Sequence, residues 1–517
     1  MMSTKPHTKL KKFLPFILII LALGARTIPG ARTIDDSYIT FRYARNLLSG
    51  EGFVYNPGER VLGTTTPLFT LLMVGLGSVS GGVEAPFPWL ALGLNALADA
   101  VTCLMLWQLG RRLKAEWAGV AAGIIWAVAP YSVTFAIGGL ETSVYVLLLT
   151  GTTLAYINHK QKWTAFCAAL ALLTRPDALI LLGPLALDWF VRSIRSKERV
   201  TPGAIIIFLL PTLSWGIFAT LYFGSPIPHS VQAKIAAYYL PPTAGFIRLL
   251  QHYATPLHQH NYLGSIGIGI GLVLFPFLFL VGARRAWQAE TRILSWLLYP
   301  WLYFAVFSIS NPLIFRWYLT PPLPAYFLFI LLGADQLLGR AFCSGFAGKA
   351  APWRQWIPAV LLCMLPLISI LTAWELHPDH GPNRAAPQMA WFKLEQLYQQ
   401  VAEMISPELD SDTVLAAGDV GALGYFTGVQ ILDTVGLNSP QTLQYYPLDK
   451  RYYVSNYAIP TKLILDEKPD WLVILEIYGR LTLLQDERFN EEYTLWRKLP
   501  SDIYDSDGML IFRQTDI

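Results

Sequence analysis

Two adjacent carboxylates stand where the chain leaves its first long apolar run. Asp35 and Asp36 follow the run at residues 13–30 and open the segment DDSYITFRYARNLL. Carboxylates beside a membrane are costly unless they are hydrated or paired, so the pair is a candidate functional site. One carboxylate could act as general base on a hydroxyl, while the other steers the base or binds a cation. The structural alternative is helix capping, because aspartate accepts hydrogen bonds from the free amides that begin a helix.

One further acid and three bases extend this site. Glu141 in AIGGLETS, Arg175 in LLTRPDALI, Lys234 in SPIPHSVQAK and Arg316 in LIFRWYLTP are all expected on the same side of the membrane as the aspartates. Arginine offers phosphate oxygens a planar fork, and lysine offers a point charge. Acids for a hydroxyl and bases for a phosphate suit transfer from a lipid phosphate. The structural alternatives are an Arg175/Asp177 pair at a proline kink, and snorkelling of the other two bases.

Weaker motifs exclude other chemistry. His252, His258 and His260 match no standard metal-site spacing, and we expect them in a hydrated loop. The run GSIGIGIG at residues 264–271 lies in an apolar segment, where glycine permits close helix approach. The sequence holds no Walker motif and no GxSxG, so an ATP-driven pump and an α/β-hydrolase have no support.

The elements that must position these residues are apolar helices. The 517 residues are 54% hydrophobic and 14% charged, against about 25% charged in soluble domains. Residues 67–80 are too short for a span and are predicted to lie at the membrane surface as an interfacial or re-entrant helix. Eleven other runs are predicted to span, near residues 13–30, 87–109, 118–137, 142–158, 163–175, 177–191, 203–222, 263–282, 293–309, 318–338 and 357–375.

Basic loops give this arrangement a direction. With residues 67–80 at the surface, most basic clusters fall on the side of the N-terminal KLKK, which the positive-inside tendency makes cytoplasmic. Asp35, Asp36 and the C-terminal region are then extracytoplasmic, and the chain is expected in the plasma membrane. The N-terminus also resembles a signal peptide ending in ALGA. We expect it to stay as the first span, because an anchor is needed just before the aspartates.

Charge and pattern divide the chain into two parts. Residues 1–375 hold 28 Lys and Arg against 14 Asp and Glu, whereas residues 376–517 hold 11 against 21. The acidic part contains short β-rich runs between Gly and Asp turns, which predicts a small α/β domain. These runs are DTVLAAGDVGALGYFTG, VQILDTVGL, DWLVILEIYG and MLIFRQ. The fold class is therefore a polytopic α-helical membrane protein of about eleven spans, with a large first outer loop at residues 31–86 and an extracytoplasmic α/β domain. The basic excess belongs to cytoplasmic loops, so no nucleic acid partner is expected.

The order of first span, acidic pair, surface helix and second outer acid resembles the C-type (GT-C) glycosyltransferase superfamily. These integral membrane enzymes take a sugar from a polyprenyl-phosphate carrier. The resemblance extends to the bacterial branch that includes the mycobacterial terminal arabinofuranosyltransferases. The blocks that carry it are IDDSYITFRYARNLLSGEGFVYNPGERVLGTTTPLF, GLETSVY, LTRPDAL, YFGSPIPHSVQAK, RWYLTPPLP and GALGYFTGVQILDTVGL.

The resemblance implies roles for named residues. We assign the base to Asp35 from its motif position, with Asp36 in support and Glu141 as the second acid. A divalent cation, Mg²⁺ or Mn²⁺, stays open, and these three acids would be its ligands. Leu62 to Thr66 read LGTTT where this branch often has Glu-Gly-Tyr-Thr-Ser, which leaves the acceptor and the sugar open. The remaining implied residues are Arg175, Lys234 and Arg316 for the carrier phosphate, and Tyr55, Asn56, Arg60 and Thr66 for the loop that contacts acceptor or donor.

The implied reaction moves a sugar, such as the pentofuranose arabinose, from a polyprenyl-phosphate donor to a cell-envelope glycan, lipid or protein acceptor. Inversion follows if an acceptor hydroxyl, deprotonated by aspartate, displaces the bound phosphate, and no nucleotide is needed. The protein then mainly positions groups and stabilises charge. The expected partners are this donor, the acceptor and membrane lipids. Two alternatives remain, namely a transporter or flippase of envelope precursors and a non-catalytic glycan-binding scaffold, although the repeated halves common in transporters are not evident.

Overall fold

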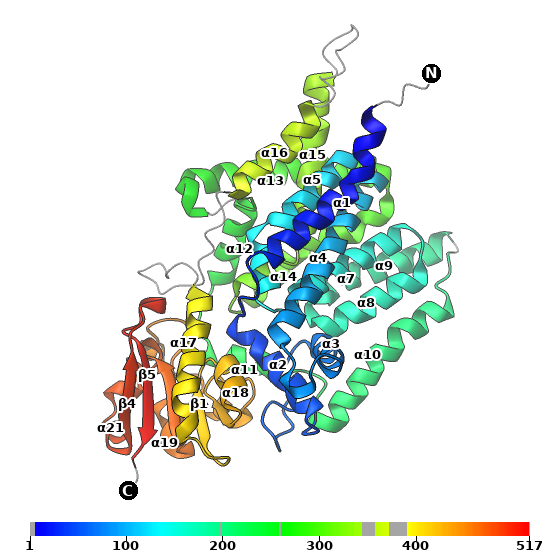
Figure 1. The fold of residues 1–517 in the computed structure, drawn as a ribbon. Helices are drawn as coiled ribbons and strands as arrows, with labels where there is room; N and C mark the ends of the chain where they lie inside the picture. Colours follow the sequence, from blue (N-terminus) through cyan, green and yellow to red (C-terminus); the bar gives the residue numbers. More distant parts are fainter. Residues whose placement is uncertain (1–5, 197, 258–259, 344–356, 372–389, 516–517) are drawn as a thin grey trace.

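A helical bundle and a smaller α/β domain lie side by side in the computed structural model (Figure 1). The structure describes residues 6–196, 198–257, 260–343, 357–371 and 390–515. The predicted boundary between residues 375 and 376 lies outside these ranges.

Five helices of the described residues are long and apolar enough to cross a membrane, which makes the chain a membrane protein. A sixth span is possible by length and composition if α5 (Glu116–Val128) and α6 (Pro130–Ile137), bent by 44°, cross together. The five fall in α4 (Phe87–Arg112), α10 (Pro202–Phe223), α13 (His260–Ala289), η3 with α14 (Thr291–Ile293 and Leu294–Ser310) and η4 with α15 (Arg316–Leu319 and Leu323–Cys343).

Helix α10 shows how the bundle meets lipid. Only 11% of its most apolar stretch is buried inside the protein, and side chains such as Ile206, Leu210 and Leu221 point outward. An exposed helix that is apolar on all sides is stable in hydrocarbon and not in water. Its placement at the edge of the bundle is clear in Figure 1.

Each of the eleven predicted spans coincides with a helix or with a bent helix pair, but the count of eleven spans is not confirmed. Helix α7 has 16 residues and α8 has 14. They rise only about 24 Å and 21 Å, against a hydrocarbon core of about 30 Å. Helix α3 (Pro67–Ser78) is short, as predicted. Besides the bent pair, the helices among the eleven that are not in the set long and apolar enough to cross are α1 (Pro6–Thr27), α7 (Thr142–Ile157), α8 (Gln161–Thr174), α9 (Leu179–Ser196) and α16 (Ile357–Leu371).

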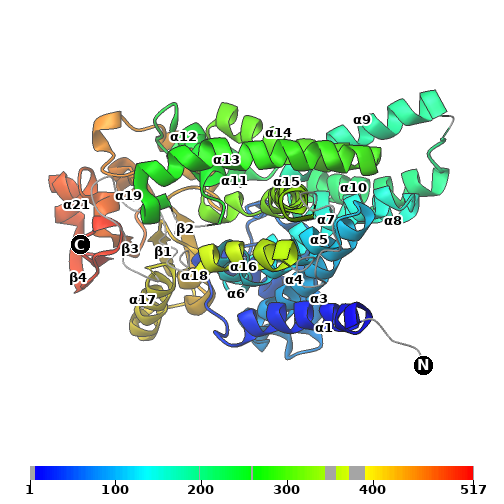
Figure 2. The ribbon, with the colours of Figure 1, turned by 90° about the horizontal axis from the view of Figure 1, so that it is seen from above.

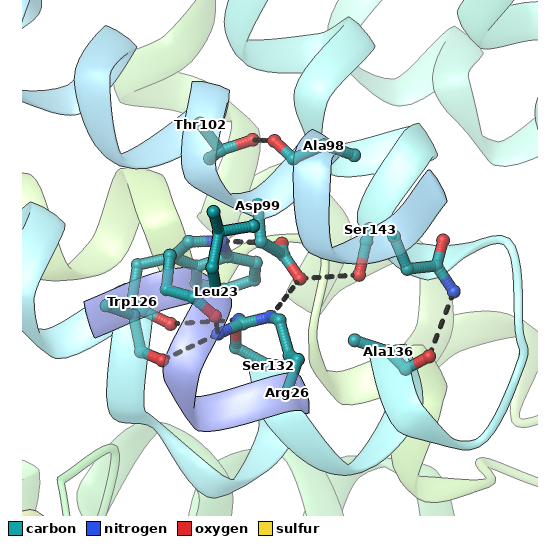
Figure 3. Close-up of polar contacts among 12 residues, drawn as sticks. Leu23, Arg26, Ala98, Asp99, Thr102, Trp126, Ser132, Ala136 and Ser143 are labelled. Atoms are coloured by element: carbon teal, nitrogen blue, oxygen red, sulfur yellow. Dashed lines mark hydrogen bonds and ion pairs between the residues drawn. The ribbon is translucent and has the colours of Figure 1, made fainter. Parts of the chain in front are cut away.

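A buried ion pair fixes the end of α1, eight residues before the acidic pair (Figure 3). Arg26 Nε donates to Asp99 Oδ2 at 2.8 Å, and its guanidinium also donates to the Ala127 carbonyl at 2.7 Å. Asp99 accepts further hydrogen bonds from Trp126 Nε1 at 2.9 Å and Ser143 Oγ at 2.7 Å. A buried pair is tolerated when additional hydrogen bonds satisfy both charges, as here. The network therefore ties α1 to α4, α5 and α7.

Helix α2 (Asp35–Leu48) lies between the bundle and the α/β domain (Figure 1). Tyr38, Phe41 and Tyr43 are buried, so α2 is enclosed rather than exposed at a surface. Arg42 is buried too, and its guanidinium donates to the carbonyl oxygens of Tyr55, Gly424 and Val429. Because the carbonyls of Gly424 and Val429 belong to the C-terminal domain, this arginine holds the two parts of the chain together.

The C-terminal domain contains a mixed five-stranded sheet in the order β2-β1-β3-β5-β4. The runs predicted as β-rich form β1 (Val414–Ala417), β2 (Gln430–Asp433), β3 (Trp471–Leu475) and β5 (Met509–Gln514). Strand β4 (Tyr493–Leu499) was not predicted, because this edge strand exposes most of its side chains. Strand β1 pairs in parallel with β2 and β3, whereas β5 pairs antiparallel with β3 and β4. Helix α17 (Ala390–Ile405) precedes the sheet and packs on α18 (Gly421–Thr427).

Candidate active site

A cavity of about 830 Å³ lies where the bundle meets the C-terminal domain. Figure 2 shows the two parts from above, with α11 (His229–Ala237) and α12 (Ala244–Ala254) beside the sheet domain. Of the residues predicted for the site, Asp35, Asp36, Lys234 and Arg316 line this cavity.

Asp35 holds the start of a helix in the other domain. Its Oδ2 accepts a hydrogen bond from the Gly421 amide at 2.8 Å, and its Oδ1 accepts one from the Ala422 amide at 2.7 Å. These amides begin α18. A Cβ added to Gly421 would lie 1.8 Å from the Asp35 carbonyl oxygen, so only glycine allows this approach. The sequence alternative, in which the aspartates cap their own helix α2, is therefore wrong. The N-cap residue of α2 is Ile34, without a side-chain hydrogen bond, and Asp35 caps α18 instead.

Asp36 lines the same cavity and accepts no hydrogen bond from the described residues. Burial raises the pKa of Asp36, and the charge of Lys234 partly lowers it. Burial and the charges of Asp419 and Asp36 also raise the pKa of Asp35, against the lowering effect of its two amide donors. Carboxylates that are more basic than in water suit proton abstraction from a hydroxyl.

Three basic side chains from the helical part line the cavity, namely Lys234, Arg248 and Arg316. The Lys234 ammonium lies 5.3 Å from the ring centre of Phe315 and 5.9 Å from that of Tyr318. The Arg316 Nε atom is buried without a hydrogen-bond partner in the described structure. Sequence reasoning missed Arg248, because a single arginine on an amphipathic helix carries no motif. Together these cations provide an environment for a phosphate.

His252 lines the same cavity. It is 5% exposed, and one ring nitrogen, Nε2, lies 2.9 Å from the Leu319 carbonyl oxygen. Burial, with the charges of Arg248 and Arg316, lowers the pKa of His252 to about 3, so the ring is neutral and Nε2 donates. The expectation of a hydrated loop is wrong for His252, because α12 packs it into the protein. His258 and the His260 side chain lie outside the described structure.

Arg175 and Glu141 form a buried cluster that does not line the described cavity. Arg175 pairs with Glu141 at 3.1 Å and with Asp177 at 3.0 Å. Its guanidinium carbon also lies 4.6 Å from the ring centre of Tyr318, whose ring is near Lys234 as well. The Arg175/Asp177 pair expected as the structural alternative is present. Phosphate binding by Arg175 and an acidic role for Glu141 stay predictions.

The loop residues Tyr55 and Asn56 face the C-terminal domain. The Tyr55 hydroxyl donates to the Val420 carbonyl at 2.6 Å, and the Asn56 side chain exchanges hydrogen bonds with the Ile431 backbone at 2.9 Å and 3.1 Å. Arg60 lies over the ring of Tyr222, and Thr66 contacts the Thr64 hydroxyl. None of these four predicted loop residues lines the cavity as described, and their contact with donor or acceptor stays a prediction.

A third carboxylate, Asp419, reaches the cavity from the C-terminal domain. It follows β1 in the run AAGDVGALG, and its Oδ2 accepts a hydrogen bond from the Tyr398 hydroxyl at 2.5 Å. Burial and the charges of Asp36 and Asp433 raise the pKa of Asp419 to about 6, although the Tyr398 hydrogen bond lowers it. Sequence reasoning missed Asp419, and the available signal was an acid inside a run predicted as β-rich, two residues after the strand ends at Ala417.

The C-terminal domain matches a family model at residues 388–512, described as a domain of unknown function, DUF8728. A segment of the chain is 30% identical over 231 residues to the terminal beta-(1->2)-arabinofuranosyltransferase of Mycobacterium tuberculosis. The match covers 39% of this chain and 35% of the relative, so the chain spans about a third of that protein's length.

Two solved structures resemble nearly the whole chain. ArnT from Cupriavidus metallidurans, bound to undecaprenyl phosphate, has a TM-score of 0.55 at 13% identity and covers 99% of this chain and 98% of its own. The oligosaccharyltransferase AglB from Archaeoglobus fulgidus, with an inhibitory peptide and a dolichol-phosphate, has a TM-score of 0.54 at 11% identity and covers 93% and 72%. The chain has the GT-C fold. Its resemblance to mycobacterial arabinofuranosyltransferases, inferred from the sequence blocks, is confirmed.

The described side chains do not form a metal site in this arrangement. No group of three or more His, Cys, Asp or Glu residues among them could hold a metal ion. Both carboxylate oxygens of Asp35 face amide donors of α18, and Glu141 lies with Arg175 outside the cavity. The three acids considered as ligands therefore do not converge in this arrangement, and the divalent cation stays a prediction.

Proposed function

We propose that the chain is a membrane glycosyltransferase that moves a sugar from a polyprenyl-phosphate donor to a hydroxyl of a cell-envelope glycan or lipid. The observation that carries the proposal is one cavity lined by the carboxylates Asp35 and Asp36 and by the cations Lys234, Arg248 and Arg316. Lipid phosphates bound by ArnT and AglB support the donor class. The arabinofuranosyltransferase relative supports a pentofuranose such as arabinose as the sugar.

In this proposal Asp36 is the general base and Asp35 positions it. Each Asp35 oxygen already accepts an amide hydrogen bond from α18, whereas Asp36 accepts none from the described residues. An oxygen without a competing donor is available to an acceptor hydroxyl. This geometry favours Asp36 over the assignment of the base to Asp35 that rested on motif position.

The cations act on the leaving group. In the proposed step the acceptor oxygen bonds to the anomeric carbon as the bond from that carbon to the phosphate oxygen breaks. The proton passes to Asp36, and the phosphate leaves on its lipid. Lys234, Arg248 and Arg316 stabilise the phosphate charge, and the partly dehydrated cavity strengthens this attraction. Attack opposite the leaving phosphate inverts the anomeric carbon.

The experiment uses the purified full chain in lipid nanodiscs with radiolabelled polyprenyl-phosphate sugars, including arabinofuranose and hexose donors. We expect transfer from at least one donor to an added envelope glycan or lipid. The control variant is Asp412→Asn, an exposed aspartate of the C-terminal domain. Failure of transfer from every donor contradicts the proposal. Movement of intact labelled donor across sealed vesicles without transfer would instead favour the transporter alternative.

A further inference from the structure

The C-terminal domain presents the carboxyl ends of its parallel strands to the cavity. Gly418 and Asp419 follow β1, Val435 follows β2, and Tyr478 follows β3, and all four line the cavity. In open α/β sheets, ligands bind outside the carboxyl ends of strands where successive connections leave to opposite sides. The order β2-β1-β3 places β1 at such a point. The carboxyl ends of these strands, where this rule expects a ligand, thus form one wall of the cavity, which we call the C-terminal wall.

Asp419 is held in place at this edge. The Tyr398 hydroxyl, from α17, donates to its Oδ2, whereas its Oδ1 accepts no hydrogen bond from the described residues. Just after Asp419 in the chain, the amides of Gly421 and Ala422 are held by hydrogen bonds to Asp35. A carboxylate restrained from both sides, with one oxygen available, can accept a hydrogen bond from a ligand at little further cost in ordering.

Three tyrosines line the cavity together with Asp419. Tyr238, Tyr457 and Tyr478 all line the cavity, and the ring centre of Tyr457 lies 5.0 Å from that of Tyr478 and 6.0 Å from that of Tyr238. Tyr478 and Asp419 both line the cavity, and after burial the charge of Asp419 is the largest cause that raises the pKa of Tyr478. Aromatic rings beside one or two fixed polar groups suit a ligand with both apolar faces and hydroxyls.

The charge of the C-terminal wall determines which part of the substrates it can bind. The cavity-lining residues of the C-terminal domain include no Lys or Arg among those described, and Asp419 is acidic. The lining cations Lys234, Arg248 and Arg316 all come from the helical part. The C-terminal wall therefore disfavours a phosphate and suits a neutral sugar ring.

We propose that the C-terminal domain supplies most of the acceptor subsite, in which Asp419 accepts a hydrogen bond from a hydroxyl of a neutral sugar and Tyr478, together with Tyr238 of the helical part, packs against its ring. This inference rests on the proposed function and gives the domain of unknown function a role in it. Tyr398 is a positioning residue that acts through Asp419.

The test separates acceptor from donor. For the full chain in nanodiscs, the KM for an alkyl arabinofuranose oligosaccharide and the affinity for radiolabelled polyprenyl phosphate are measured in wild type, Asp419→Asn and Asp412→Asn. Loss of a hydrogen bond to a charged group raises the acceptor KM of Asp419→Asn by about 10-fold or more. Donor affinity stays within about twofold, and Asp412→Asn behaves as wild type. Tyr398→Phe raises the acceptor KM less, with kcat largely kept.

Saturation-transfer NMR with the same oligosaccharide gives a readout that needs no turnover, and thermal unfolding midpoints identify misfolded variants. An acceptor KM and a glycan signal unchanged in both Asp419→Asn and Tyr398→Phe overturn the inference while the transferase stands. No glycan signal from wild type at millimolar concentration also overturns it. Asp419-dependent glycan binding in a protein that transfers no sugar supports the subsite and overturns the transferase instead.

Discussion

At the scale of residues, two adjacent aspartates differ through their neighbours. Asp35 accepts two amide hydrogen bonds from α18, whereas burial raises the pKa of Asp36 and the charge of Lys234 partly lowers it. The sequence predicts a functional role for this pair, because carboxylates beside an apolar span are costly unless hydrated or paired, and that role stays a prediction. It could not show that the two carboxylates differ, since the amide donors to Asp35 come from Gly421 and Ala422, more than 380 residues away.

The first prediction separates the two aspartates. Asp36→Asn should lower kcat by about 100-fold or more with donor affinity kept, because a base acts in the transition state. Asp35→Asn should lower kcat less but also lower the thermal unfolding midpoint, because an amide replaces the carboxylate that caps α18. Transfer rates and unfolding are measured on each purified variant. Near-normal transfer by Asp36→Asn would show that Asp36 is not the general base.

The second prediction concerns the carrier phosphate. Lys234→Met should weaken binding of a polyprenyl phosphate by about 10-fold or more, because a charged hydrogen bond contributes about 1.5–3 kcal/mol. The exposed Lys462→Met in the C-terminal domain is the matched control. Binding of radiolabelled polyprenyl phosphate gives the measurement. Equal affinities for the two variants would leave Lys234 as packing against Phe315 and Tyr318.

The third prediction is the pH dependence of transfer. The base must be deprotonated to act, and burial raises the pKa of Asp36 above the ordinary 3.8. The value of kcat/KM should therefore fall as pH drops through that raised pKa, at a higher pH than for an exposed aspartate. Rates between pH 4 and pH 8 test this for wild type and Asp412→Asn. Activity that stays constant down to pH 4 would contradict a base with a raised pKa.

At the scale of elements, local sequence patterns were sufficient to predict most helices and four strands, because the spacing of apolar residues within a short run indicates a helix or a strand. The docking of the first outer loop was not predictable in this way. Tyr55 reaches Val420, and Asn56 reaches Ile431, across 365 and 375 residues. Helix α18 was also missed, because the run GALGYFTG sits between two strands and is only seven residues long.

The fourth prediction belongs to the contact between α2 and α18. Gly421→Ala would place a methyl group 1.8 Å from the Asp35 carbonyl oxygen, so the two helices must move apart. Overpacking of this kind costs about 1–3 kcal/mol or more. We expect a lower unfolding midpoint together with reduced transfer. Gly75→Ala in α3 is the control, because its Cβ would meet no atom within 4 Å. Equal midpoints for both variants would show that the domains are not held by this contact.

At the scale of the whole molecule, the cavity belongs to neither part alone. The helical part provides its cations and the Asp35/Asp36 pair, and the C-terminal domain provides Asp419 and the carboxyl edge of its sheet. The two domains were predictable from composition, but the shared cavity depends on their docking through Arg42. Because both parts line one cavity beside the helices, Asp35, Asp36 and the C-terminal domain must lie on the same side of the membrane.

The last prediction states on which side of the membrane the cavity lies. Basic loops favour the cytoplasm, so the N-terminus should be cytoplasmic and the C-terminal domain outside. In a chain whose four cysteines are replaced by serine, a membrane-impermeant thiol reagent added to intact cells should label Ser411→Cys but not Ser196→Cys. Permeabilised cells should show labelling at both positions, which controls for access. The reverse pattern in intact cells would place the cavity in the cytoplasm, where an acceptor of the envelope could not reach Asp419, and the proposed reaction would fail with the topology.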